Sequence, residues 1–311
     1  MSYYSHLNLS REPFSTSPDP DLLFLSREHK SALYRLCVAV KLRRGQSLIL
    51  GDVGTGKTTL SRKFCQMMAC DAGMIVRVIL NPGFEGAADF LRAICEQFGV
   101  ATVMDGQPAG FAEMSAAIRH YLFQKGVEEK KTVVLVVDEA QKMNEASLEV
   151  LRGLLNYETN DHKLLQAVMF SQLDLVPRLL KVKNFWDRIS MKALLRTLSF
   201  EEARQMIAFR MQVSGAGPEN GLFSDEALQS IYQVTRGYPR RITQLCHDCL
   251  ESLVMNGRSR VDRQTVDEIL EREVLIGGRL LGSLARNESR PGTATNGTHV
   301  FERSHTGRAA V

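Results

Sequence analysis

Gly51-Asp52-Val53-Gly54-Thr55-Gly56-Lys57-Thr58 is the stretch that decides the fold. The apolar run 47–50 precedes it, and a helical pattern starting near Thr59 follows it. Glycine, four arbitrary residues and then Gly-Lys-Thr, set between a strand and a helix, predict a phosphate-binding loop. Its glycines let the backbone wrap around an anion, and its amides point inward at the start of the helix. We expect the stretch, with Thr59, to bind ATP, Lys57 reaching the outer phosphates and Thr58 holding Mg²⁺.

A second landmark begins at residue 132. The run 132–137 is almost wholly apolar and β-branched, which is typical of a strand buried on both faces of a parallel sheet. It ends in Asp138-Glu139. We expect Asp138 to hold Mg²⁺ and Glu139 to act as general base on the attacking water. The alternative is that both carboxylates only cap the helix after the strand.

Strands alternate with helices through the middle of the chain, which indicates a parallel α/β sheet with right-handed crossovers. Strands are expected at 47–50, 74–80, 132–137, 164–170 and, more weakly, 190–195. Helical periods lie between them at 58–68, 87–98, 111–124 and 146–157. In such a sheet, ligands bind at the carboxyl ends of the strands, which is where both landmarks lie.

Four regions follow from these patterns. Residues 1–46 are an extended opening and a helix that begins after Ser26, a plausible N-cap, and residues 47–198 are the α/β core. From Ser199 onward the pattern is helical only, so residues 199–276 are expected to form a small helical domain, with helices at 199–213, from 224, at 239–257 and at 262–273. Residues 277–311 are rich in Gly, Ser, Thr, Asn and Arg, which predicts a disordered basic tail.

Composition describes an ordinary soluble protein. The 311 residues are 44% hydrophobic and carry a net charge of +4, most of it in the tail, so the nearly neutral folded part gives little support for strong nucleic-acid binding. We found neither a membrane-spanning apolar run nor a signal peptide, and we expect a cytoplasmic protein.

The six cysteines mostly lie within apolar helical patterns and are expected to be reduced core residues. Cys246-His247-Asp248-Cys249 invites a metal interpretation, but no second Cys/His pair lies at a suitable spacing.

The order of these parts resembles an AAA+ ATPase, and more narrowly the ATPase domain of the general secretion pathway protein A (ExeA/GspA) family. The resemblance covers about residues 1–275 and implies a P-loop αβα sandwich with a five-stranded parallel sheet, followed by a small all-α lid domain. Besides the phosphate loop, the matching strings include Pro13-Phe14, Phe24-Leu25-Ser26-Arg27-Glu28-His29, Asp138-Glu139-Ala140-Gln141, Leu154-Leu155-Asn156-Tyr157-Glu158-Thr159 and Gly237-Tyr238-Pro239-Arg240.

The resemblance also implies roles for further residues. Arg240 matches the second sensor, which contacts the phosphates from the lid, with Arg241 as a possible stand-in. Gln172 falls at the polar sensor after the fourth strand, where the family has Gly-Gln-Pro-Glu-Leu and this chain has Ser171-Gln172-Leu173-Asp174-Leu175, so its exact role is open. Phe24, Arg27 and His29 belong to the segment that passes near the adenine, although His29 could equally be a helix residue without a ligand.

Arg188, just before the fifth strand, is the best candidate for an arginine finger that acts on the nucleotide of a neighbouring subunit, with Arg196 the next candidate. The alternative is a surface arginine paired with Asp187 or Glu201. A finger in trans implies a homo-oligomer, because its charge arrives only when subunits pack.

The leading functional hypothesis is an ATPase that couples nucleotide-dependent assembly to action on a protein partner. Members of that family commonly continue into a membrane helix and a peptidoglycan-binding domain, and we find neither in this sequence. We therefore expect either a stand-alone relative or a system whose envelope part is a separate polypeptide. In the second case, a partner would bring the protein to the inner membrane. The alternative hypothesis is a DNA-binding ATPase that resembles the transposition regulators TnsC and MuB. In that case the DNA phosphates would be contacted by the basic tail and by Lys181, Lys183 and Arg188. A third hypothesis is a nucleotide-sensing switch with negligible turnover.

Overall fold

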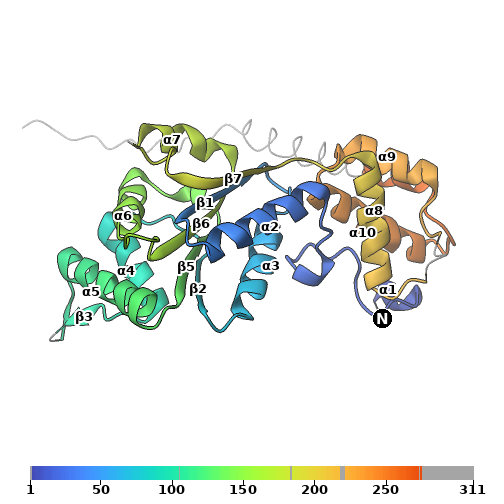
Figure 1. Ribbon diagram of the computed structural model, residues 1–311. Helices are drawn as coiled ribbons and strands as arrows, with labels where there is room; N and C mark the ends of the chain where they lie inside the picture. The colour runs from blue at the N-terminus through green and yellow to red at the C-terminus, as the bar shows by residue number, and fades with distance from the viewer. Residues whose placement is uncertain (1, 105, 183, 218–220, 273, 275–311) are drawn as a thin grey trace, which may run out of the picture. The chain divides into compact units, whose positions relative to one another are not determined.

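The computed structural model describes residues 2–104, 106–182, 184–217, 221–272 and 274. Five parallel strands form its central sheet in the order β2-β5-β6-β1-β7 (Figure 1). The strands are β1 (Gln46–Gly51), β2 (Met74–Ile79), β5 (Thr132–Val137), β6 (Leu165–Ser171) and β7 (Ile189–Leu195). All five strands predicted from the sequence are confirmed.

Burial on both faces explains why β5 is so apolar. Val134 and Val136 belong to the core on one face of the sheet, while Val133, Leu135 and Val137 belong to the core on the other. All five side chains are fully buried. A strand between two helical layers cannot alternate apolar with polar residues, which is why its sequence is a continuous apolar run.

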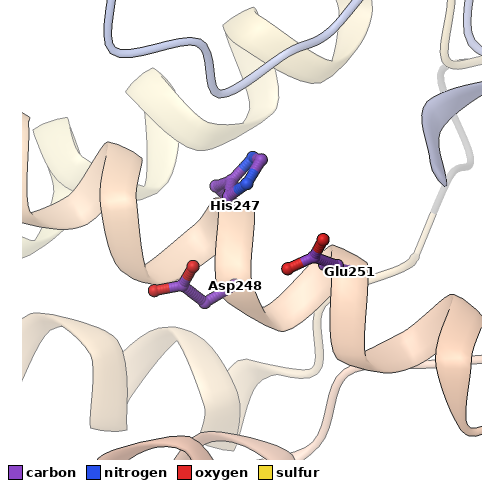
Figure 2. Close-up of side chains that lie close together, drawn as sticks. All are labelled: His247, Asp248 and Glu251. Carbon is purple, nitrogen blue, oxygen red and sulfur yellow. The ribbon is translucent and has the colours of Figure 1, made fainter. Parts of the chain in front are cut away.

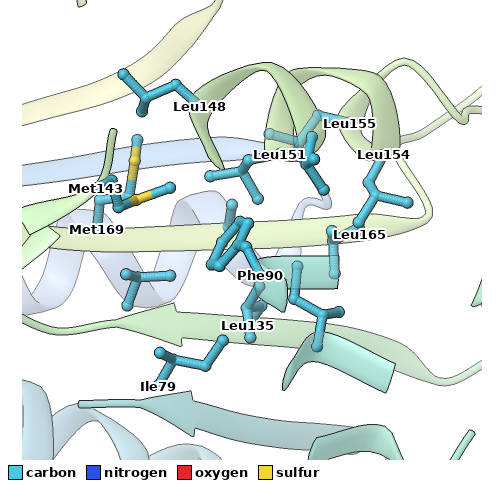
Figure 3. Close-up of a cluster of buried hydrophobic side chains, with 14 of the residues drawn as sticks. Ile79, Phe90, Leu135, Met143, Leu148, Leu151, Leu154, Leu155, Leu165 and Met169 are labelled. Atoms are coloured by element: carbon cyan, nitrogen blue, oxygen red, sulfur yellow. The ribbon is translucent and has the colours of Figure 1, made fainter. Parts of the chain in front are cut away.

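Helices cover both faces of the sheet, which confirms the αβα sandwich. On one side, α2 (Arg27–Lys41) and α3 (Lys57–Ala69) pack Leu36, Leu60 and Phe64 against the strands. On the other side, α4 (Ala87–Phe98), α5 (Phe111–Phe123) and α6 (Glu145–Leu155) build a larger core. Figure 3 shows this core, with Phe90 of α4 between the strands and the leucines of α6.

The strand order determines which loops meet. Since β6 lies between β5 and β1, and all three run in one direction, the segments that follow them leave from neighbouring positions at the same edge of the sheet. The phosphate loop follows β1, Asp138-Glu139 follows β5 and Gln172 follows β6. The fold therefore brings these predicted residues to one edge.

The C-terminal part is helical, as expected, with α8 (Phe200–Val213), α9 (Asp225–Thr235), α10 (Pro239–Met255) and a helical stretch at 263–272. Ser199 and Glu202 form the predicted capping box, in which each side chain accepts from the other residue's backbone N–H. Ser224 caps α9. The predicted tail, 277–311, lies outside the described residues, and no described helix is long and apolar enough to cross a membrane.

Short elements are where the structure departs from the sequence-based expectations. The opening segment holds a one-turn helix, α1 (Tyr3–His6), and a two-stranded hairpin, β3 (Val103–Met104) with β4 (Gln107–Pro108), occupies the expected loop before α5. A further helix, α7 (Val176–Lys181), follows β6. Strands of two residues and helices of fewer than two turns are too short to carry a readable hydrophobic period.

Candidate functional site

The phosphate loop joins β1 to α3 through two glycines in left-handed backbone conformations. Gly54 has a φ of 82° and Gly56 a φ of 94°. A Cβ on Gly54 would lie 3.1 Å from the Cβ of Arg240, and a Cβ on Gly56 would lie 3.2 Å from Nε2 of His29. Both positions therefore need glycine for conformation and for space. The resulting loop curls over the N-terminus of α3, as anion binding requires.

Lys57 begins α3 and is almost completely buried beneath the loop. Its Nζ donates hydrogen bonds to the carbonyl oxygens of Gly51 at 2.9 Å and Asp52 at 2.8 Å. Burial lowers the pKa of Lys57, and the nearby carboxylates of Glu139 and Asp138 oppose that shift. The ammonium group is thus held inside the loop, among carboxylates that favour its charged form.

Asp138 directly follows β5 and is only 2% exposed. Burial raises the pKa of its carboxyl, while hydrogen bonds from the Glu139 backbone N–H and the Thr58 side chain oppose the shift. A buried carboxylate beside a threonine hydroxyl is an all-oxygen donor pair, the type of ligand that Mg²⁺ prefers. The structure thus brings Thr58 and Asp138 together, as the sequence predicted.

Glu139 follows with a φ of 54°, a left-handed conformation that is uncommon outside glycine. Its carboxylate lines the cavity and accepts a hydrogen bond from the side-chain amide of Gln141. The amide oxygen of Gln141 in turn accepts from the backbone N–H of Gln172 at 3.2 Å and from the Ser171 hydroxyl at 3.4 Å. Gln141 therefore ties Glu139 to the end of β6.

The cavity over the loop has a volume of about 360 Å³. Its lining includes the predicted residues Lys57, Glu139, Gln172 and Arg240. The N-terminal segment, the phosphate loop and the C-terminal helices supply the rest: Ser15, Thr16, Ser17, Pro18, Leu23, Phe24, His29, Val53, Gly54, Thr55, Gly56, Thr58, Thr59, Leu198, Met206, Arg210, Pro239 and Thr243. One end is thus the polar loop, and the other walls contain several apolar side chains.

The C-terminal helices touch the phosphate loop directly. The backbone N–H of Arg240 donates to the Gly54 carbonyl at 3.2 Å. The Tyr238 hydroxyl donates to Asp52 at 2.7 Å, and the Arg241 guanidinium lies 5.1 Å from the centre of the Tyr238 ring. Arg240 is therefore at the loop, whereas Arg241 is engaged with Tyr238.

Of the three residues predicted to lie near the adenine, Phe24 precedes α2, whereas Arg27 and His29 lie in its first turn. Phe24 lines the cavity. His29 is buried, with Nε2 3.0 Å from the Thr55 carbonyl and Nδ1 2.7 Å from the Ser26 hydroxyl, and burial lowers its pKa. His29 therefore supports the loop from behind. Arg27 is outside the described lining, and its backbone N–H donates to Glu202.

Arg188 lies at the opposite edge of the sheet from the loop. It precedes β7, whose first residue pairs with Gln46 at the start of β1, whereas the loop begins at the end of β1. A strand rises by about 3.3 Å per residue, so the two ends of β7 are about 20 Å apart. Arg188 is exposed and donates to the Asn156 side chain, and no described ion pair joins it to Asp187 or Glu201. Arg196 lies 3.8 Å from Glu28.

Three of the six cysteines are core residues as expected, Cys95 and the pair Cys246 and Cys249 of α10, whereas Cys37 and Cys65 are half-buried and Cys70 is exposed. Both α10 thiols are buried, and burial raises the pKa of Cys249 to about 12. His247, Asp248 and Glu251 offer ligand atoms within 4.8 Å of one another on this helix (Figure 2). However, Nδ1 of His247 already lies 3.0 Å from Glu12 and 3.1 Å from the Tyr3 hydroxyl. The His247 side chain therefore connects the N-terminal segment to α10.

Comparisons with known proteins agree with this geometry. The family model described as an AAA domain matches residues 41–179, which contain the phosphate loop and Asp138-Glu139. General secretion pathway protein A of Aeromonas hydrophila is 34% identical over 261 residues, which make up 83% of this chain and 46% of that protein. The chain thus contains an AAA domain, at residues 41–179. It spans less than half the length of this AAA relative.

Solved structures share the AAA fold at lower identity. The ORC2 protein of Aeropyrum pernix has a TM-score of 0.61 at 16% identity, covering 85% of this chain and 71% of that one. Cdc6p of Pyrobaculum aerophilum has a TM-score of 0.61 at 17% identity, covering 81% and 69%. The RuvB Holliday junction branch migration motor of Thermotoga maritima has a TM-score of 0.53 at 16% identity, covering 81% and 72%. These likenesses support the fold.

Two residues at this site, Gln141 and Tyr238, had no role predicted from the sequence. Gln141 was part of a family-matching string, and its place two residues after Glu139 was the available signal. Tyr238, in Gly-Tyr-Pro-Arg, had no signal of its own, because its partner Asp52 lies 186 residues away.

Proposed function

We propose that the chain binds ATP and hydrolyses it with Mg²⁺. The observation that carries this proposal is the convergence of Lys57, Thr58, Glu139 and Gln172 on one cavity, with Asp138 buried beside Thr58. Triphosphate hydrolysis needs neutralised phosphate charge and a positioned water. The ammonium of Lys57 and the loop amides answer the first need, and the carboxylate of Glu139 answers the second.

Thr58 and Asp138 would hold the Mg²⁺ ion. Asp138 supports the fit of this site to a cation. Its carboxylate is buried, its pKa is raised, and it forms no ion pair with a lysine or arginine in the described part of the chain. A cation beside it would offset the cost of that buried charge. When bound, the ion would supply charge neutralisation on the phosphate oxygens.

The remaining residues position the reactants. Gln141 orients the Glu139 carboxylate, which takes a proton from the attacking water. Gln172 reaches the γ-phosphate or the water from the end of β6, and Arg240 adds positive charge beside the loop. His29 fixes the loop backbone through the Thr55 carbonyl.

Two substitutions test the proposed hydrolysis. Lys57→Ala should abolish ATP binding, and Glu139→Gln should bind ATP but barely cleave it. Lys63→Ala, on the same helix as Lys57 but outside the cavity lining, is the matched control and should retain both properties. Calorimetry gives binding and phosphate release gives turnover. Equal turnover in the wild type and Glu139→Gln would refute the general base.

The position of Arg188 supports a finger in trans. The length of β7, about 20 Å, separates the start of the strand, where Arg188 lies, from the phosphate loop of the same subunit. We therefore assign the exposed guanidinium to the nucleotide of a neighbouring subunit, which it would reach by giving up its hydrogen bond to Asn156. We therefore include a homo-oligomer in the proposal, assembled in the presence of ATP. The mass of the protein in solution, with and without ATP, tests the assembly.

Mixing two inactive variants tests the finger. Arg188→Ala keeps its own site but offers no finger, whereas Glu139→Gln offers a finger but has no base. The mixture should recover part of the turnover that each variant lacks alone. Arg196→Ala, which removes the other candidate arginine, should remain active. If Arg188→Ala hydrolyses ATP normally, Arg188 is not the finger.

We further propose that the ATPase works in the cytoplasm, where ATP is available, and that it acts on a protein partner from a secretion system. Support comes from the 34% identity to general secretion pathway protein A. A partner should co-purify with Glu139→Gln in ATP and be lost with Lys57→Ala. Salt-dependent binding of duplex DNA by Glu139→Gln in ATP would instead support a transposition regulator.

A further inference from the structure

Arg210 of α8 lines the cavity without an acidic partner. Its Nη1 makes two long hydrogen bonds, to the carbonyl oxygens of Pro13 at 3.5 Å and Ser15 at 3.4 Å. Its Nε is buried and has no hydrogen-bond partner in the described chain. No ion pair found among the described residues includes Arg210. A guanidinium has five N–H donors, so most of its hydrogen-bonding capacity here is unused or weakly used.

Such an arginine is costly for the fold alone. Burial lowers the pKa of Arg210 to about 10. A buried cation is ordinarily matched by a carboxylate or by short hydrogen bonds, because the protein interior solvates charge poorly. Arg210 is half-buried at the wall of a cavity that a ligand can enter, and it has neither at contact distance among its described neighbours. The carboxylate of Asp19 acts on it through space, but Asp19 forms its ion pair with Arg11, at 3.6 Å. An acceptor on that ligand would give the guanidinium a better partner than its two long hydrogen bonds.

The neighbours of Arg210 show which end of the cavity it faces. Its hydrogen bonds go to the N-terminal segment, whose residues Ser15 and Pro18 also line the cavity, and Met206 lines it from one turn earlier on α8. No described hydrogen bond joins Arg210 to the phosphate loop. At the loop, the C-terminal helices contribute Arg240 instead. Arg210 thus belongs to the wall made of the N-terminal segment and α8, away from the groups that hold phosphates.

We propose that Arg210 binds the nucleoside part of the nucleotide, donating an N–H of its guanidinium to an acceptor atom of the base or sugar. This inference rests on the proposed ATP binding and adds a specificity-determining residue to it. The planar guanidinium suits a flat, acceptor-bearing ring better than an ammonium would, so lysine should not replace it. The apolar side chains of Phe24 and Met206 complete a wall fit for a base.

The test compares ATP with inorganic tripolyphosphate, which has the same phosphate chain but no nucleoside. Affinities of both are measured with Mg²⁺ by calorimetry for the wild type, Arg210→Gln and Arg210→Lys. Both variants should lose roughly tenfold to a hundredfold in affinity for ATP, the range of a hydrogen bond from a charged donor, and retain tripolyphosphate binding. Arg204→Gln, at an exposed arginine of the same helix, should change neither.

The unfolding temperatures of the wild type and the variants, measured without ligand, separate a loss of binding from a loss of stability. Removing an uncompensated cation should leave the midpoint of Arg210→Gln at or above that of the wild type, while the shift that ATP induces becomes smaller. Equal losses for ATP and tripolyphosphate, or unchanged ATP affinity, would overturn the role in nucleoside binding. A wild type that binds neither ligand would refute the proposed ATP binding itself, and this inference with it.

Discussion

Replacing Gln141 by leucine tests whether Glu139 must be held in place to act. The Gln141 side chain is 8% exposed and joins three groups: it donates to the Glu139 carboxylate and accepts from the Gln172 N–H and the Ser171 hydroxyl. Leucine is of similar size but can make none of these bonds. Glu139 would keep its charge and lose its only described side-chain hydrogen bond.

The size of the effect follows from the type of bond. A hydrogen bond to a charged group contributes about 1.5–3 kcal/mol. If that free energy holds the base in its productive orientation, its loss raises the barrier by a similar amount, which lowers kcat about 10- to 150-fold. Binding of ATP should change little, because Lys57, Thr58 and the loop glycines are untouched.

The assay is steady-state phosphate release over a range of ATP concentrations, with ATP affinity measured in parallel. Gln205→Leu is the matched control, because Gln205 makes the same type of bond to Glu201, at 3.1 Å, on an exposed face of α8. A normal kcat in Gln141→Leu, even with lower stability, would show that Gln141 supports the fold and does not position the base. A raised KM with unchanged kcat would also refute the reasoning.

Three further predictions concern stability. Gly237→Ala should lower the free energy of unfolding in urea by about 2–4 kcal/mol, since its Cβ would lie 2.1 Å from the Leu198 carbonyl oxygen. Gly257→Ala, also at positive φ but in open space, should lower it by about 1 kcal/mol. Equal losses for the two variants would exclude the clash. Because burial lowers the pKa of His29, stability should fall as pH drops below about 6.5, and His29→Gln should weaken that dependence in pH-dependent melts. Because burial raises the pKa of Asp138, Asp138→Asn should be more stable than the ligand-free wild type at pH 7 but no more stable at pH 3; lower stability at pH 7 would contradict this.

The sequence was sufficient for the sheet and for the residues at its carboxyl edge. The run of β5 is apolar because both of its faces are buried, and this pattern is local. The roles of Gly54 and Gly56 could be predicted because the loop needs left-handed backbone at these two positions, and glycine adopts it without strain. Strand order then places Asp138 near the loop, since parallel strands present their carboxyl ends together.

Contacts between distant segments could not be predicted in the same way. No role for Arg210 was predicted from the sequence, and only the packing of the N-terminal segment against α8 shows that its Nε is buried without a described partner. His29 had two open interpretations until its bond to the Thr55 carbonyl was visible. In both cases the decisive group is a backbone carbonyl, which every residue has, so no residue type marks it in the sequence.

Asp52 shows what such contacts add to the mechanism. In the sequence it is one of the four arbitrary positions of the loop motif, but in the fold its carboxylate accepts a hydrogen bond from the Tyr238 hydroxyl, which lowers the pKa of Asp52. Two residues later, the Gly54 carbonyl accepts from the Arg240 N–H at the start of α10. The loop is therefore bonded to α10 at two points, through one side chain and one backbone group. A displacement of α10 relative to the loop must break both bonds, so the arrangement of the C-terminal helices and the shape of the phosphate loop are linked.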